Sequence, residues 1–276
     1  MAIKTLKPTT PARRGMTTAD FGSLTAKQPV KSLLRSKKQK SGRNNAGRIT
    51  SRHRGGGAKK FYRLVNFSPS KELDLTVEAI EYDPNRSARI ARVIDQGGRY
   101  HYVLATKGLK VGHKLAIGAS SSIEPGNRLL IEAIPVGTVI SSVELVPGRG
   151  AQLARSAGTS VQLIAKEDKL AQIKLPSGEV RVVDISCQAT VGTIGNLQHQ
   201  NIKLGSAGRK RRQGRRPHVR GIAMNAADHP HGGGEGKGKG NDPQSPWGQP
   251  ALGFKTRRRK STDKYIVRSR HQSKRR

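Results

Sequence analysis

Four side chains in the C-terminal third of the chain have the chemistry to hold a divalent cation. Asp228, His229, His231 and Glu235 lie within a short stretch, and carboxylates and imidazoles are common ligands of zinc and manganese. Two lysines follow directly and would repel a cation, and the surrounding glycines supply no rigid frame. We therefore expect no metal site and no cofactor here.

The same stretch contains glycine patterns that resemble parts of enzyme motifs. His231-Gly232-Gly233-Gly234 matches the oxyanion-hole motif of esterases, but the chain lacks the Gly-x-Ser-x-Gly pentapeptide that carries the nucleophile. Residues 233–239 fit the start of a P-loop, yet Gly240 stands where the magnesium-binding hydroxyl belongs, and no strand precedes the loop. Gly192-Thr193-Ile194-Gly195 matches the clamp of KH domains without the flanking helices. These incomplete motifs make an enzyme the less favoured interpretation. An ester-turnover assay would distinguish an enzyme from a protein without catalytic activity.

A glycine-rich loop among cations has another use. Without side chains the backbone can approach a crowded surface closely, and its N–H groups can face phosphates. Gly232, Gly233 and Gly234, with Lys237 and Lys239 beside them, are therefore expected to pack against nucleic acid.

Positive charge gathers at the two ends of the chain. Residues 1–63 carry a net charge of +16, residues 64–198 carry +2 and residues 199–276 carry +17. Self-repulsion opposes compaction of such segments, and a dense polyanion relieves it. We expect extended basic arms that bind nucleic acid. Charge alone also permits a nucleoid or histone-like DNA-binding protein, and preference for folded RNA over duplex DNA would distinguish the two classes.

The near-neutral middle of the chain has the pattern of β-structure. Short runs rich in β-branched and aromatic residues alternate with turn sequences, and Pro176-Ser177-Gly178 is typical of a hairpin loop. The predicted strands are 76–82, 89–94, 100–105, 113–117, 128–132, 138–145, 161–165, 170–175 and 180–184. Prolines at 217, 230, 243, 246 and 250 exclude a long helix from the C-terminal arm.

Two sets of closely spaced strands predict an all-β fold with two small barrels in tandem, because closure removes exposed sheet edges. We place the boundaries at 1–63 for the N-terminal extension, 64–125 and 126–198 for the barrels, and 199–276 for the C-terminal extension. Cys187, the single cysteine, excludes an internal disulfide and lies in an apolar stretch that predicts a buried thiol.

Targeting segments are not expected. No apolar run approaches the length of a membrane span, and the N-terminus lacks the apolar core of a secretory signal. Residues 1–60 have the composition of a transit peptide, but Pro8, Pro11 and Pro29 would interrupt its amphipathic helix.

Several segments together resemble the ribosomal protein L2 family of the large subunit. The most specific is Met224-Asn225-Ala226-Ala227-Asp228-His229-Pro230-His231-Gly232-Gly233-Gly234-Glu235-Gly236. Supporting segments are 42–44 with 47–57, 153–160, 172–179 and 215–221. The similarity runs nearly end to end in the bacterial or organellar style. Two positions depart from it: Ala226-Ala227 replaces a common Pro-Val, and Arg212 stands where an aromatic residue is common.

The resemblance implies an OB-fold followed by an SH3-like barrel, with long extensions buried in large-subunit rRNA. It also implies roles in subunit assembly and association, and a loop near the peptidyl transferase centre. The expected partners are rRNA, other ribosomal proteins and the small subunit at the interface, with no membrane and no homo-oligomer. The expected location is the cytoplasmic ribosome, with an organellar matrix as the alternative.

The residues expected to contact RNA combine these motifs with the basic clusters. They are Arg43, Arg48, Arg52, His53, Arg54, Lys59, Lys60, Arg155, Ser156, Thr159, Arg209, Arg211, Arg215, Arg216, Arg220, His229, His231, Gly232, Gly233, Gly234, Lys237, Lys239, Arg257, Arg258, Arg259 and Lys260. No catalytic residue is expected. His229 could act as a general base for peptide transfer or position the loop through a hydrogen bond, and we favour positioning. Because the chain has one Trp, five Tyr and four Phe, we expect recognition by shape and phosphate contacts rather than by base stacking.

Overall fold

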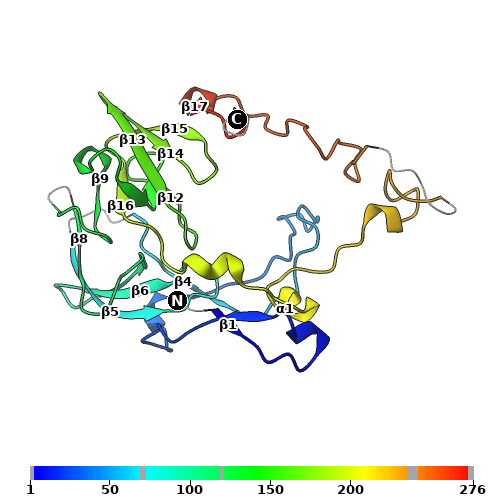
Figure 1. Ribbon diagram of the computed structural model, residues 1–276, viewed down its shortest axis with the longest axis horizontal. Helices are drawn as coiled ribbons and strands as arrows, with labels where there is room; N and C mark the ends of the chain where they lie inside the picture. Colours follow the sequence, from blue (N-terminus) through cyan, green and yellow to red (C-terminus); the bar gives the residue numbers. More distant parts are fainter. Residues whose placement is uncertain (1–2, 69–72, 119–120, 235–241, 273–276) are drawn as a thin grey trace. The chain divides into compact units, whose positions relative to one another are not determined.

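The computed structural model describes residues 3–68, 73–118, 121–234 and 242–272, and the chain divides into two compact units (Figure 1). Unit 1 comprises Met1–Lys38, Lys59–Ser206 and Lys264–Arg276. Unit 2 comprises Gln39–Ala58 and Ala207–Asp263. Each unit therefore combines segments that are far apart in the sequence.

Most of the regular secondary structure of unit 1 is β-strand. Its described strands form an eleven-stranded ladder in the order β17-β15-β14-β13-β10-β16-β9-β8-β5-β6-β7. In chain order these strands are β5 (Leu73–Glu81), β6 (Ile90–Asp95), β7 (Tyr100–Leu104), β8 (Lys114–Ile117), β9 (Arg128–Leu130), β10 (Val139–Ser141), β13 (Val161–Glu167), β14 (Leu170–Lys174), β15 (Val180–Asp184), β16 (Gln188–Val191) and β17 (Ile266–Arg268). Neighbours are antiparallel except β8 and β9, which pair in parallel at Ile117 and Arg128. The pairing order does not close into a ring, so the expected closed barrels are not seen among the described strands.

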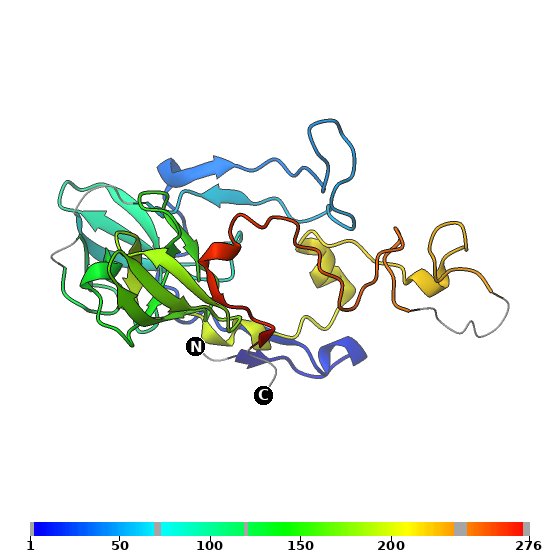
Figure 2. The ribbon, with the colours of Figure 1, turned by 90° about the horizontal axis from the view of Figure 1, so that it is seen from above.

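Short paired strands and helical turns complete the described structure. The pairs are β1 (Ile3–Thr5) with β2 (Thr17–Ala19), β3 (Leu34–Ser36) with β4 (Phe61–Arg63), and β11 (Val143–Glu144) with β12 (Ala151–Leu153); Figure 2 shows β3 and β4 side by side. The helical turns are η1 (Pro11–Arg13), η2 (Lys31–Leu33), η3 (Ile131–Ala133), η4 (Leu197–Asn201), η5 (Gly221–Ala223) and η6 (Asp263–Tyr265), with one α-helix, α1 (Ala207–Arg212). In the described parts of the chain, no helix has the length and apolar character to span a membrane.

The part of the ladder formed by β8, β5, β6 and β7 encloses one hydrophobic core. Alternate residues of β5 are buried, as expected for a strand with one face toward the interior. Leu75 and Val77 of β5 pack with residues of β6 and β8 and of the loop after β7; the full cluster is Leu75, Val77, Ala91, Val93, Ala105, Leu109, Leu115 and Ile117. The alternation of residue types along β5 therefore corresponds to a strand with one face buried and the other more exposed.

A second core lies in the other half of the ladder. It contains Leu129, Ile131, Ile134, Ile140, Val143, Val161, Leu163, Ala171, Ile173, Val183, Cys187, Ala189 and Val191. The expectation that Cys187 is buried is confirmed, and burial raises the pKa of its thiol to about 11. The thiol therefore stays protonated at neutral pH and packs as a small apolar group.

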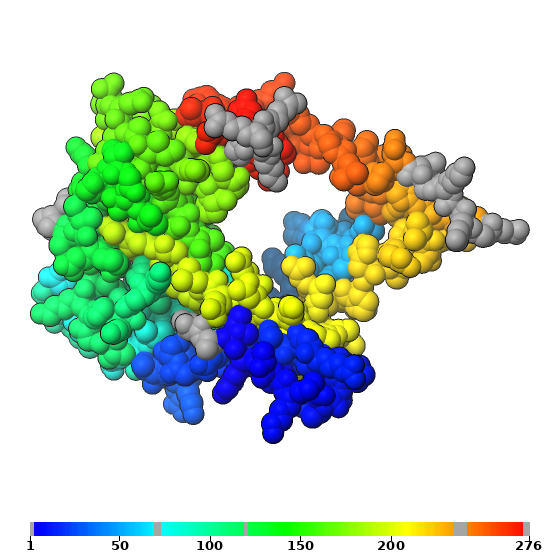
Figure 3. Space-filling view, viewed as in Figure 1, coloured from blue at the N-terminus to red at the C-terminus, as the bar shows by residue number. Residues whose placement is uncertain are grey.

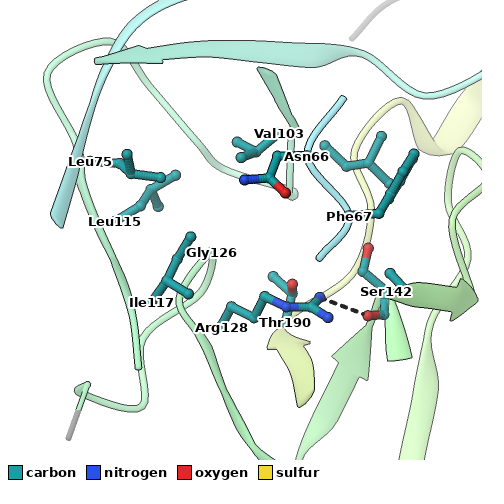
Figure 4. A pocket seen from close by; sticks show the side chains of 12 residues that line it. Asn66, Phe67, Leu75, Val103, Leu115, Ile117, Gly126, Arg128, Ser142 and Thr190 are labelled. Carbon is teal, nitrogen blue, oxygen red and sulfur yellow. Dashed lines mark hydrogen bonds between the residues drawn. The ribbon is translucent and has the colours of Figure 1, made fainter. Parts of the chain in front are cut away.

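A buried ion pair joins the elements around the second core. Arg128 Nη2 donates to Glu144 Oε1 at 3.0 Å, and the same carboxylate accepts backbone N–H groups of Gly150 and Gln188, each at 3.1 Å. Arg128 Nη1 also donates to the Ser142 carbonyl at 3.0 Å (Figure 4). Burial lowers the pKa of Arg128, yet its charge is matched by Glu144, so neither group is left unpaired in the interior.

Figure 4 also shows the residues that line a small cavity beside Arg128. Its volume is about 40 Å³, and its lining includes Leu75 and Leu115 from the first core and Thr190 beside the second. Ligand pockets usually measure about 300 Å³ or more. This cavity is therefore a packing gap between the two cores rather than a substrate site.

Parts of both basic extensions belong to unit 1 and bond to its strands. Thr25 exchanges two hydrogen bonds with the backbone of Ile80, through its N–H at 3.1 Å and its Oγ1 at 2.8 Å. Arg89, only 2% exposed, lies over the rings of Phe21 and Tyr82 at 4.8 and 5.3 Å. Near the other end of the chain, β17 pairs with β15. Pairing with the edge strand β15 therefore holds β17 in unit 1, although the C-terminal extension is strongly basic.

Most of the predicted strands are confirmed, with shifted ends. The run 138–145 is interrupted at Ser142, whose φ of 49° ends β10 and starts β11 in a new direction. The Pro176-Ser177-Gly178 turn is confirmed, since Gly178 has a φ of 85° and its N–H donates to Leu175 at 2.9 Å. Seven short strands of the described chain were not predicted, because each depends on a neighbouring strand for pairing; they are β1, β2, β3, β4, β12, β16 and β17.

Tyr102→Phe should destabilise unit 1. Tyr102 is fully buried, and its hydroxyl donates to Glu81 Oε2 at 2.8 Å while accepting the Val30 N–H at 2.9 Å. Removing the hydroxyl leaves the Val30 N–H and the Glu81 carboxylate without this hydrogen-bonding partner. The loss should lower the free energy of unfolding by about 1–3 kcal/mol. Urea unfolding of the full chain measures the change in the free energy of unfolding. Tyr100→Phe, at an exposed position on the same strand, is the control; equal effects of both substitutions would contradict the prediction.

Candidate nucleic-acid interface

Unit 2 holds no hydrophobic core among its described residues. All buried apolar side chains of the described chain lie between Leu75 and Ile194, which belong to unit 1. In Figure 3 the orange segment of unit 2 is a narrow strip of atoms. Backbone hydrogen bonds and tight turns must therefore supply the order that a core supplies elsewhere.

Backbone pairing brings the two basic segments of unit 2 together. The N–H of Gly55 donates to Gly214 at 3.0 Å, that of Ala58 to Arg212 at 2.9 Å, and that of Arg216 to His53 at 3.0 Å. Arg54 and Arg215 are antiparallel bridge partners. A Cβ on Gly57 would lie 3.0 Å from the backbone of Gly214, so a glycine permits this close approach.

This pairing concentrates positive charge well in excess of negative charge. By sequence, unit 2 has 19 Lys and Arg residues and four Asp and Glu residues. The side chains of Arg54, Arg215 and Arg216 are exposed, and within the described part of unit 2 Arg257 is paired with Asp263 at 2.8 Å. Backbone bonds thus hold guanidinium groups near one another, where a phosphate backbone would neutralise them.

A tight loop presents two further arginines. Arg43 and Ile49 are bridge partners, and the turn between them is closed by Asn44, whose Oδ1 accepts the Arg48 N–H at 2.9 Å. The Gly42 carbonyl accepts the N–H groups of Thr50 and Ser51 at 2.9 and 3.0 Å. Arg43 and Arg48 are exposed on this ordered loop, as an interface with RNA requires.

The glycine-rich loop folds back on itself. Gly232 donates its N–H to His229 at 2.9 Å, and Gly233 donates its N–H to Met224 at 3.1 Å. A Cβ on Gly232 would overlap the carbonyl of Asn225, and a Cβ on Gly233, whose φ is 78°, would lie 2.8 Å from Ala226 Cβ. These two glycines therefore permit the loop's own conformation, and their contact with RNA remains a prediction. A Cβ on Gly234 would meet no other described residue within 4 Å.

Histidine side chains hold this loop in place. His229 is only 8% exposed, and its Nδ1 accepts the His231 N–H at 3.0 Å. Because Nδ1 is the acceptor, the proton of the neutral ring lies on Nε2. His231 Nε2 is 3.1 Å from the Gln244 N–H and 3.2 Å from the Asp242 carbonyl, and the tautomer decides which of these bonds forms. The rings themselves are 4.9 Å apart.

The metal-ligand candidates are not gathered into a cluster. Within the ranges that the structure describes, no three His, Cys, Asp or Glu side chains are grouped as metal ligands would be. His229 directs its Nδ1 to the backbone of His231, and Asp228 is exposed. Glu235, Lys237 and Lys239 lie outside the described residues.

Other candidate residues belong to unit 1. Arg155 is exposed, donates to the Ala151 carbonyl at 3.1 Å and lies over the Phe67 ring at 5.0 Å. The Thr159 hydroxyl donates to the Ser156 carbonyl at 2.7 Å, which stabilises their own turn. Lys59 and Lys60 precede β4. These positions remain predicted RNA contacts.

The remaining candidates of unit 2 lie on its surface. Arg211 and Arg220 are exposed, Arg209 is half-buried in α1, and the block Arg257, Arg258, Arg259 and Lys260 is exposed throughout. His53 packs edge-on against His218, with ring centroids 4.4 Å apart. His53 thus supports the paired segments rather than facing outward.

Sequence reasoning overlooked Trp247, an exposed side chain of unit 2 that contacts Arg52. The available signal was the sequence Ser245-Pro246-Trp247-Gly248, which has the residues of a tight turn.

Comparison with protein-family models assigns the chain to a family. The model described as Ribosomal Proteins L2, RNA binding N-terminal domain matches residues 30–117. The model described as Ribosomal Proteins L2, C-terminal domain matches residues 124–248. The chain belongs to the ribosomal protein L2 family.

Membership in the L2 family confirms the resemblance seen in the sequence and identifies an RNA-binding protein of the large ribosomal subunit that takes part in translation. The family is a structural ribosomal family rather than an enzyme family, and its members work in the ribosome, in the cytoplasm or in an organelle matrix. The L2 matches include both halves of the arginine pairing, residues 53–58 and 212–216, and the loop through Gly234.

Gly232→Ala should unfold the glycine-rich loop of this L2-family protein. The added Cβ overlaps the Asn225 carbonyl, so the hydrogen bond from Gly233 to Met224 cannot persist. Loss of a bond worth about 1 kcal/mol corresponds to roughly fivefold faster exchange of the Gly233 amide hydrogen. Hydrogen exchange followed by NMR provides the measurement. Gly208→Ala in α1, where a Cβ meets nothing within 4 Å, is the matched control, and unchanged exchange at Gly233 in both variants would show the prediction wrong.

Proposed function

We propose that unit 2 is the principal rRNA-binding surface of this L2-family protein and that it supports assembly of the large subunit. The observation that carries the proposal is the backbone pairing of residues 53–58 with 212–216, which places Arg54 and Arg215 side by side. Folded rRNA provides phosphates at the density needed to neutralise them. The protein thereby reduces repulsion between RNA segments while they pack.

Unit 1 acts in this proposal as the folded scaffold. We assign its two cores to the OB-fold-like part, residues 64–125, and the SH3-like part, residues 126–198, that L2 family membership suggests. The remaining residues, 1–63 and 199–276, act as the extensions. Their short pairings with unit 1 give the basic segments defined points of departure.

The proposal includes a place for the glycine-rich loop near the peptidyl transferase region and a contribution to subunit association. Other ribosomal proteins and the small subunit are the further partners, and the protein acts as a single copy. The internal bonds of the loop support this role, because a preorganised loop loses little conformational entropy when it docks against RNA. Gly234, where a Cβ would meet no other described residue within 4 Å, supplies a backbone that RNA could approach.

The geometry of His229 favours positioning over proton transfer. The one lone pair of the neutral ring, on Nδ1, accepts the His231 N–H, and the side chain is buried. A general base needs a free lone pair within about 3 Å of the proton that it removes. RNA, rather than this side chain, would then perform peptide-bond chemistry.

Substitution of the paired arginines tests the RNA-binding surface. In the full chain, Arg215→Gln with Arg216→Gln should remove up to two phosphate contacts and reduce the slope of log K against log salt for an rRNA fragment by about 1.4–1.8. Filter binding over a range of salt concentrations measures the slope. Lys169→Gln with Lys174→Gln, at exposed positions of unit 1, removes equal charge and should leave the slope unchanged. Equal slopes for both double variants would refute the assignment, and equal affinity for duplex DNA would favour the nucleoid-protein alternative.

A His229→Asn substitution separates positioning from catalysis. The Oδ1 of the introduced asparagine replaces Nδ1 as the acceptor of the His231 N–H but cannot serve as a base at neutral pH. We expect assembled large subunits that carry His229→Asn to form peptide bonds at a near-normal rate, whereas His229→Leu should impair assembly. Single-turnover peptidyl transfer on purified subunits gives the rate. A loss of about a hundredfold in fully assembled His229→Asn subunits would instead identify a general base.

A further inference from the structure

The only tryptophan of the chain lies at the tip of a small hairpin in unit 2. The Gly248 N–H donates to the Ser245 carbonyl at 2.9 Å, and the Ser245 N–H donates to Gln249 at 2.8 Å. Pro246 presets the first central position of the turn, and Gly248 adopts a φ of 76° after Trp247. The sequence Ser-Pro-Trp-Gly therefore places the indole at a defined point of a rigid turn.

The base of this hairpin is joined to the glycine-rich loop. Gln244 and Pro250 are bridge partners, and the Gln244 N–H lies 3.1 Å from His231 Nε2. The hairpin and the loop are thus connected within unit 2. A side chain at its tip is held with little freedom of the backbone, which reduces the entropy lost on binding.

The indole is exposed, yet one cation lies against it. Trp247 is 73% exposed, and the Arg52 guanidinium carbon is 4.8 Å from the ring centroid. Among the described residues of unit 2 there is no core that could bury the ring. The indole therefore retains a large open surface, with a guanidinium group beside it.

The positive charge around Trp247 indicates which kind of molecule could bind the exposed indole ring. Arg52 and the neighbouring basic segments repel cationic partners and attract polyanions. A flat aromatic surface backed by a cation stacks well on a nucleobase, and an apolar protein partner would have to desolvate the guanidinium group. A nucleic acid with an unpaired base offers phosphates to the guanidinium group and a flat face to the indole ring.

We propose that Trp247, supported by Arg52, stacks on an unpaired nucleobase of RNA. The proposal rests on the RNA-binding function above and adds a base contact to a surface otherwise expected to recognise phosphate and shape. Paired bases present no free face in a helix, so the occupant is a base in a loop, a bulge or a single-stranded segment.

Intrinsic fluorescence tests the proposal directly, because Trp247 is the sole tryptophan. The full chain is titrated with an unstructured oligoadenylate of about twelve nucleotides and, separately, with inorganic polyphosphate carrying the same number of phosphates. Both should bind through charge. Stacking predicts quenching of the Trp247 emission by the oligonucleotide and little change with polyphosphate. Equal quenching by both ligands would overturn the proposal.

Affinity measurements supply a second readout. Trp247→Leu should weaken binding of a labelled oligoadenylate by roughly 5- to 150-fold, the range for loss of one stacked base, and leave polyphosphate binding unchanged. Trp247→Phe should restore part of the lost affinity, which a change that merely disturbs the hairpin would not do. Phe254→Leu removes another exposed aromatic ring of unit 2 and is the matched control, expected to bind as the unchanged protein does.

The outcomes distinguish this inference from the proposed function. If Trp247→Leu binds both oligoadenylate and an rRNA fragment with unchanged affinity, the stacking contact is refuted and the RNA-binding surface stands. If the unchanged protein binds neither rRNA nor oligoadenylate, the proposed function itself fails and the stacking proposal fails with it.

Discussion

Repulsion between arginine side chains is the constraint on which unit 2 depends. Arg54 and Arg215 are bridge partners, and the backbone bonds of residues 53–58 with 212–216 hold them there. No apolar core in the described part of unit 2 offsets that repulsion. Such an arrangement is stable to the extent that a polyanion neutralises it, so the affinity for RNA and the order of this unit are linked.

Unit 1, in contrast to the described part of unit 2, is stabilised by hydrophobic cores. Its cores bury apolar side chains from neighbouring strands, and the buried carboxylates Glu81 and Glu144 have hydrogen-bonding partners. Glu144 accepts bonds from Arg128 and from backbone N–H groups, and Glu81 accepts the Tyr102 hydroxyl. Burial raises the pKa of Glu81, whereas its bond to Tyr102 and the nearby Arg92 lower it, and burial prevails. Unit 1 can therefore fold without a partner's charge, which suits a scaffold.

Glycine has two distinct roles in the loop that contains His229. Gly232 and Gly233 allow the chain to pack against its own backbone, while Gly234 has open space around it. His229 and His231 then fix the loop through ring nitrogens that bond to backbone groups. The two histidines that suggested metal binding or catalysis thus form hydrogen bonds to backbone groups of unit 2.

Much of this protein could be predicted from the sequence because the controlling physics was local. Alternating apolar residues predicted β5 and its neighbours, Pro-Ser-Gly predicted the hairpin turn at 176–178, and the uneven charge predicted a polyanionic partner. The motif around His229 identified the family, which the family models confirm. Each of these predictions depends on residues close together in the chain.

Only the tertiary structure decided which distant residues meet: the pairing of β17 with β15, the bridge between Arg54 and Arg215, and the contact of Arg52 with Trp247. No periodicity specifies such partners, because a short strand or an exposed arginine is compatible with many neighbours. Their choice results from the free energy of the whole fold, in which sheet edges and backbone hydrogen-bonding groups must find partners.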